Sequence, residues 1–145
     1  MRVMAVDYGD AHTGIAVSDE TASLVGEAWV IHEKSQVAVV SAIVAQAGSR
    51  GVSVIVVGFP KNMNGTIGPR AAISDQFAER LRSMCDIEVV LWDERLTTMS
   101  AHRILTDAGR HGKKRKRAVD AVAASLILES YLSYMRQGAD PSSCV

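Results

Sequence analysis

Short apolar runs separated by turn signals make up the first third of the chain. Residues 3–7, 14–18 and 27–32 have the length and the β-branched content of strands. Tyr8-Gly9-Asp10 and Asp19-Glu20-Thr21 stand between them as turns. Because these strands are short and closely spaced, the pattern predicts an antiparallel meander of three strands.

After this meander the period of the apolar positions changes. Residues 35–48 have apolar side chains at helical spacing, with Ser35 as the expected N-cap. Two continuously apolar runs, residues 52–57 and 87–92, are typical of parallel strands buried on both faces. Helical spacing returns at residues 70–84, at residues 97–107, and from Ala118 to Met135.

This order of elements predicts an α/β fold. A meander followed by alternating helices and strands gives a five-stranded mixed sheet, with three antiparallel and two parallel strands, flanked by helices. A chain of 145 residues can bury a full core in one domain, which we expect to span residues 1–137. Residues 138–145 are expected to form a flexible tail.

The composition excludes several classes of protein. No apolar run approaches the ~18 residues of a membrane span, and the first residues do not resemble a signal peptide. The two cysteines are too few for a disulfide framework or a zinc site. We therefore expect a reduced, cytoplasmic protein that does not associate with membranes.

Three carboxylates stand beside apolar segments, where an unpaired charge is costly. Asp7 closes the first predicted strand, Glu94 follows the last one, and Asp120 opens the last helix. Ligand sites of α/β sheets lie at the carboxyl ends of the strands, so Asp7 and Glu94 should share one side if their strands are parallel neighbours. Three converging acids would form an oxygen-rich site for a hard divalent metal.

Each acid also has an ordinary structural explanation. Asp7 could cap its own turn, and Asp120 could be a first-turn acid favoured by the helix dipole. On a helix, however, the face of Asp120 would include Ala124 and Ile127, which should meet the sheet. Glu94 has the neighbouring Asp93 as a rival, because adjacent residues of a strand point to opposite faces.

The net charge of zero hides a polarised layout. Residues 110–117, the basic run, hold six of the 16 Lys and Arg residues and no acid, so the rest of the chain has a net charge of −6 (10 positive against 16 negative). Such a layout favours a polyanionic partner at one edge, although a solvated loop is the plainer interpretation. The candidate contacts to a nucleic-acid backbone are Lys61, Asn62, Arg95, Lys113, Lys114, Arg115, Lys116 and Arg117.

Four strings, taken in order, resemble the YqgF/RuvX family of RNase H-like nucleases. The resemblance implies an RNase H-like fold and a nuclease, described mainly as a processor of the 5′ end of pre-16S rRNA and earlier as a Holliday junction resolvase. Carried over by motif position, the family's acids fall on Asp7, Glu94 and Asp120. The hairpin departs from the family pattern, which usually has a basic residue where Ala11 and His12 stand. The four strings are DYG…GIAVSD (7–19), VVGFPKNMNGT (56–66), WDERLTT (92–98) and VDAVAASLILESYL (119–132).

The expected chemistry is metal-dependent hydrolysis of phosphodiester bonds. Two Mg²⁺ or Mn²⁺ ions about 4 Å apart can activate water and stabilise the leaving oxygen. Asp7 would contact both ions, and Glu94 and Asp120 would each complete one coordination sphere, with Asp93 in reserve.

Three hypotheses about the substrate follow. The first is a ribonuclease that acts on structured pre-rRNA. The second is a DNase for branched DNA, which would need a homodimer with two active sites. The third is a module that binds nucleic acid or phosphate without catalysis.

Overall fold

The computed structural model describes residues 1–60, 68–94 and 112–136, and for residues 112–121 it describes the backbone alone. These residues form a five-stranded sheet in the order β3-β2-β1-β4-β5. The meander β1-β2-β3 is antiparallel, whereas β4 is parallel to β1 and β5 is parallel to β4. The predicted mixed sheet is therefore confirmed. Its strands are β1 (Arg2–Asp7), β2 (His12–Ser18), β3 (Val25–His32), β4 (Val52–Phe59) and β5 (Glu88–Asp93).

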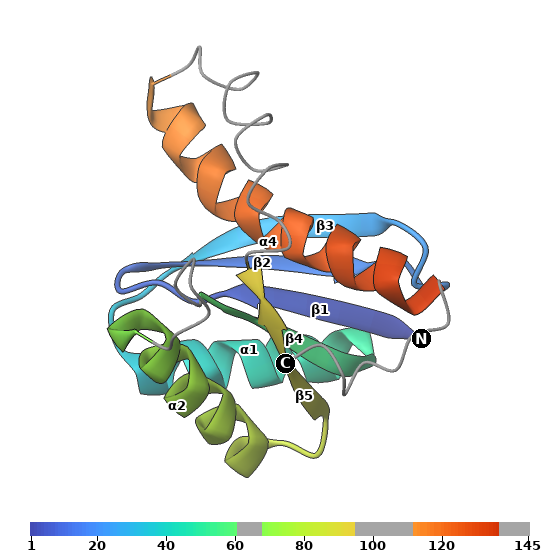
Figure 1. Ribbon diagram of the computed structural model, residues 1–145, viewed down its shortest axis with the longest axis horizontal. Helices are drawn as coiled ribbons and strands as arrows, with labels where there is room; N and C mark the ends of the chain where they lie inside the picture. Colours follow the sequence, from blue (N-terminus) through green and yellow to red (C-terminus); the bar gives the residue numbers. More distant parts are fainter. Residues whose placement is uncertain (61–67, 95–111, 137–145) are drawn as a thin grey trace.

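Helices cover both faces of the sheet (Figure 1). The helices α1 (Gln36–Arg50) and α2 (Pro69–Met84) lie on one face, and α4 (Gly112–Arg136) lies on the other. Across the described ranges, no helix has the length and apolar character needed to cross a membrane. The helix predicted at residues 97–107 and the tail predicted at residues 138–145 lie outside the described residues.

Helix α1 begins where the sequence predicted. The side chain of Ser35 accepts a hydrogen bond from the backbone N–H of Ala38 at 3.3 Å, which satisfies one of the unpaired donors of the first turn. The helix continues past Gly48 and ends at Arg50. Gly51 then adopts a left-handed conformation with φ 65°, which a glycine tolerates without a steric penalty.

Strand alternation divides the core into two layers. One layer, between the sheet and α1 and α2, contains Met4, Val6, Ile55, Val57 and Phe77. The other layer lies beneath α4, and it takes the alternate residues of the same strands. Its members include Val3, Ala5, Val54, Val56 and Trp92 of the sheet and Ala124, Ile127, Leu128 and Tyr131 of α4.

Helix α4 begins earlier than predicted, at Gly112 rather than near Ala118. The interpretation of the basic run as a loop is therefore wrong from Gly112 onward, and Lys113 to Arg117 lie in the first turns of the helix. No acid occurs in the first turn of α4, and Asp120 lies about two turns inside it. The explanation of Asp120 as an acid placed by the helix dipole is consequently removed, because that effect fades beyond the first turn.

Candidate active site

Asp7 and Glu94 reach the same edge of the sheet from two strands that are not neighbours. Asp7 ends β1, and Glu94 directly follows β5, but β4 lies between these strands. Asp7 and Glu94 were expected to share one side if their strands were neighbours, but β1 and β5 are not neighbours. Because β4 is parallel to both, the carboxyl ends of all three strands still meet at one edge.

Gly58 of β4 allows the two acids to meet across the intervening strand. The register pairs Val6 with Val57 and Gly58 with Trp92, so Gly58 lies at the level of the strand ends. A Cβ atom at this position would lie 3.0 Å from Cδ of Glu94 and 2.8 Å from Cδ1 of Ile127. The carboxyl group of Glu94 therefore occupies the space above Gly58, beneath α4.

Asp7 and Glu94 form a hydrogen-bonded carboxyl pair, which we call the acid pair. Burial, followed by repulsion from Asp7 and the hydrogen bond to Asp7, raises the pKa of Glu94 to about 8. Attraction by Arg70 acts in the opposite direction, and Asp93 adds a smaller repulsion. Two carboxyl groups in contact cannot both ionise at low cost, so the pair retains a proton at neutral pH.

The phase of β5 distinguishes Glu94 from its neighbour Asp93. Val89 and Leu91 pack in the layer of α1 and α2, whereas Val90 and Trp92 pack beneath α4. Alternation gives Asp93, which is 6% exposed, the phase of Val89 and Leu91. Glu94 instead contacts the space shared by Gly58 and α4, where Asp7 also lies.

The predicted sheet-facing side of α4 is confirmed from Ala124 onward, since Ala124, Ile127 and Tyr131 are buried. The helix runs from the acid pair toward the opposite edge of the sheet, where Arg136 donates a hydrogen bond to the carbonyl of Ser23 at 3.3 Å. Asp120 precedes Ile127 by two turns and so belongs to the end of α4 nearer the acid pair.

The side chain of Asp120 lies outside the described part of the chain, as do those of Lys113 to Arg117. The same holds for Lys61, Asn62 and Arg95. Among the side chains that are described, the structure brings together two of the three predicted acids. No group of three metal-ligating side chains is present among them.

Sequence reasoning overlooked Arg70, which lies beside the acid pair. Its guanidinium donates one hydrogen bond to the carbonyl of Tyr8 and another to the carboxylate of Asp10, each at 3.0 Å. Both partners belong to the turn that follows Asp7. The available signal was an arginine in the first turn of the predicted helix that follows a buried strand in the sequence. The sequence pattern assigned it only to the helix.

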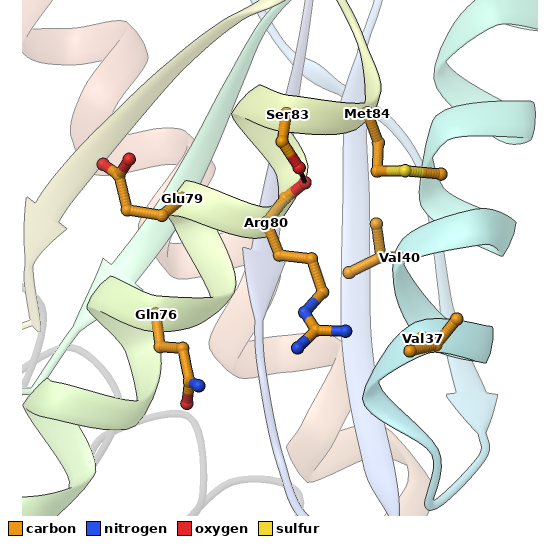
Figure 2. A pocket seen from close by; sticks show the side chains of 7 residues that line it. All are labelled: Val37, Val40, Gln76, Glu79, Arg80, Ser83 and Met84. Atoms are coloured by element: carbon orange, nitrogen blue, oxygen red, sulfur yellow. Dashed lines mark hydrogen bonds between the residues drawn. The ribbon is translucent and has the colours of Figure 1, made fainter.

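A groove between α1 and α2 lies in the other layer of the molecule (Figure 2). Its volume is about 480 Å³, and neither member of the acid pair lines it. The edge of the sheet, rather than this groove, therefore holds the candidate chemistry. The residues lining the groove are Val37, Val40, Gln76, Glu79, Arg80, Ser83 and Met84.

Comparison with solved structures gives the fold. The structure of T. thermophilus RuvC in complex with a Holliday junction substrate matches with a TM-score of 0.66 at 11% identity, covering 97% of this chain and 98% of that chain. The Fowlpox virus resolvase with Holliday junction DNA matches with a TM-score of 0.54 at 12% identity, covering 97% of this chain and 100% of that chain. These likenesses establish the fold, which is the RuvC-like form of the RNase H fold.

Comparison of sequences gives the family. The family model described as "RuvX: Holliday junction resolvase" matches residues 1–134. The "Putative pre-16S rRNA nuclease" of Geobacillus thermodenitrificans is 46% identical over 139 residues, which cover 94% of this chain and all of the relative. That of Bacillus cytotoxicus is 44% identical over 135 residues, 91% of this chain and 98% of the relative. The chain belongs to the RuvX family, and the predictions of this family and of a nuclease, a phosphodiester hydrolase, are confirmed.

Proposed function

We propose that this protein is a metal-dependent nuclease that processes the 5′ end of pre-16S rRNA. In this proposal the metal-binding carboxylates are Asp7, Glu94 and Asp120. The observation that carries it is the acid pair, in which Glu94 lies over Gly58 in hydrogen-bond contact with Asp7. The activity assigns the protein to the cytoplasm, where rRNA is processed.

The acid pair fits a hard divalent cation. Its donors are carboxylate oxygens, which suit Mg²⁺ or Mn²⁺ better than softer metals. The raised pKa of Glu94 means that a proton now offsets the mutual repulsion of the two groups, and a cation would replace that proton. When bound, two such ions supply an activated water and stabilise the leaving oxygen.

The remaining residues take roles that follow from their positions. Asp7 ends β1, the middle strand of the sheet, and would contact both ions, whereas Glu94 and Asp120 would each hold one. Helical phase supports Asp120, because it shares a face with Ala124 and Ile127, and Ile127 contacts the same space as Glu94. Asp93 has the phase of the opposite layer and becomes the weaker candidate.

Charge along the chain supports a nucleic-acid substrate held mainly by its backbone. Lys61, Asn62 and Arg95 follow strands that end at the same edge as the acid pair. The basic residues 113–117 lie in the first turns of α4, N-terminal to the turns that pack near the acid pair. Contacts of this kind hold phosphates and carry little base specificity.

Cleavage of branched DNA is the rival activity, because the matching family model is described as a Holliday junction resolvase. Resolution of a junction requires paired cuts, and therefore two active sites in a symmetric dimer. The fold comparison does not separate the two activities, since one fold hosts several. The rRNA substrate is favoured by the names of relatives about 45% identical over nearly the whole chain.

The test offers the purified protein two substrates in parallel. One is an RNA fragment that spans the 5′ end of pre-16S rRNA, and the other is a four-way DNA junction. With Mg²⁺ or Mn²⁺ we expect defined RNA products, which EDTA abolishes. Paired nicks in the junction together with a dimeric sedimentation coefficient would favour the resolvase instead. Binding of either substrate without cleavage at any metal concentration would leave a non-catalytic module.

A further inference from the structure

Arg70 joins the turn after Asp7 to α2, which lies on the face of the sheet opposite to α4. Arg70 belongs to the first turn of α2, which follows the N-cap Gly68 and Pro69. Its two hydrogen bonds, to the carbonyl of Tyr8 and to Asp10, bring its guanidinium to the edge that holds the acid pair. Its positive charge acts to lower the pKa of Glu94, against the larger opposite effects of burial and of Asp7.

The two partners of Arg70 differ in how firmly they hold it. The carbonyl of Tyr8 is well fixed, because the Tyr8 ring stacks on Phe77 of α2 with centroids 4.2 Å apart and planes 13° apart. Asp10, in contrast, is a side chain on the exposed tip of the turn, with 87% of its surface accessible against 48% for Arg70. An exposed ion pair of this kind is weak and is readily exchanged for another anion.

We propose that Arg70 is a substrate-binding residue that contacts a phosphate of the nucleic acid beside the acid pair, with Asp10 as its partner only in the absence of substrate. This inference rests on the proposed function, because it assumes that a phosphodiester lies at the acid pair. Tyr8 keeps the guanidinium aimed at the edge of the sheet, and the incoming phosphate replaces the carboxylate of Asp10.

Chemistry favours this exchange. A guanidinium presents five N–H donors in a planar fork that matches two phosphate oxygens, and the bond to Tyr8 uses one donor of that fork. A phosphate bound next to two carboxylates also needs a fixed positive charge to offset their repulsion. Asp10 adds a negative charge at the same edge, so it competes with the substrate rather than assisting it.

The proposal makes opposite predictions for the two members of one ion pair. Arg70→Gln should weaken binding of a labelled RNA stem with a single-stranded 5′ extension by about 3–10-fold, and it should reduce the slope of log K against log salt by about 0.7–0.9. Asp10→Asn should leave the slope unchanged and tighten binding by about 2-fold, because the competing carboxylate is removed. Arg70→Lys should retain the slope but lose part of the affinity, since a lysine lacks the fork.

A purely structural role for the ion pair gives a different pattern. In that case Arg70→Gln and Asp10→Asn would both lower the melting temperature and both weaken RNA binding. Arg80→Gln is the matched control, because Arg80 is an exposed arginine of the same helix that lines the groove against α1. It should leave affinity and salt slope unchanged, and a loss equal to that of Arg70→Gln would overturn the proposal.

The binding assay is performed in EDTA and does not depend on catalysis. If the wild-type protein binds RNA with the expected Arg70 dependence but never cleaves it, the proposed function fails while the phosphate contact stands. If the protein cleaves RNA while Arg70→Gln leaves KM and the salt slope unchanged, the contact fails and the nuclease stands. In a cleaving protein we expect the change in KM to exceed the change in kcat, as removal of a binding contact requires.

Discussion

At the carboxyl ends of β1 and β5, the two faces of the sheet carry different kinds of residues. Toward α1 and α2, the apolar layer is closed by Tyr8, whose ring stacks on Phe77. Toward α4, the layer ends at Asp7 and at Glu94, which lies over Gly58. Asp7 and Tyr8 are consecutive residues, yet one contributes to the acid pair and the other to packing. The alternation of side chains lets one strand end support packing on one face and the proposed chemistry on the other.

The most direct test of this difference removes one negative charge on each side of the sheet. Asp7→Asn should reduce metal-dependent cleavage roughly 10³-fold, because the residue proposed to contact both ions loses its charge. Its stability should not fall, since the repulsion with Glu94 is relieved at the same time. Asp75→Asn, on the exposed side of α2, is the control and should leave cleavage unchanged. Full activity of Asp7→Asn would remove the acid pair from the mechanism.

The pH dependence of the free energy of unfolding should also distinguish the face with the acid pair from the face that packs against α1 and α2. The pKa of Glu94 is raised from 4.5 to about 8 in the folded protein, so the folded state binds the proton more tightly than the unfolded state does. The free energy of unfolding in EDTA should therefore fall as pH rises from about 4.5 to 8, by on the order of 2–4 kcal/mol.

Glu94→Gln should abolish this decline, because the amide carries no titrating proton. Urea unfolding at pH 5, 7 and 9 measures the effect, and Glu88→Gln at the exposed start of the same strand is the control. An equal pH dependence in the wild type and in Glu94→Gln would contradict the assignment. Added Mn²⁺ should stabilise the wild type most at high pH, where the metal no longer competes with the proton.

Two glycines allow a smaller and more local comparison. Gly58→Ala should destabilise the protein by about 1–3 kcal/mol, since its Cβ would overlap the carboxyl of Glu94 and the side chain of Ile127. It should also lower activity, because Glu94 must move. Gly48→Ala in α1 meets no atom within 4 Å and should instead stabilise by about 0.5–1 kcal/mol without changing activity. Urea unfolding and cleavage assays on both variants provide the check, and similar behaviour of the two would show that Gly58 is not specially constrained.

The strands and helices could be predicted well because each follows from a pattern of apolar and polar residues within a short segment of the sequence. The strands of the meander, the two buried strands and the cap of α1 at Ser35 all follow from patterns within a few residues. The start of α4 was placed six residues too late, because Gly112 and the clustered like charges of the basic run resemble a loop. A helix can nevertheless carry such charges when its later turns are anchored in a core.

The relations between distant segments could not be predicted in the same way. The order of the parallel strands, with β4 between β1 and β5, depends on how the helical connections cross the sheet. The choice between Asp93 and Glu94 depends on the phase of β5, which a continuously apolar run does not reveal. Gly58 directly follows the predicted strand of residues 52–57, and Arg70 opens a predicted helix, but neither position reveals its role, because the residues that they contact are distant in the sequence.

The position of β5 has a consequence for the order in which the protein acquires activity. Asp7 emerges from the ribosome before Glu94, which directly follows the edge strand β5. Because a domain folds as a unit, the acid pair forms only after β5 has been synthesised and has joined the sheet. Under the proposed function, a chain that has not yet added Glu94 cannot cut the RNA around it. Under the same proposal, the protein becomes a nuclease only when β5 has joined the sheet.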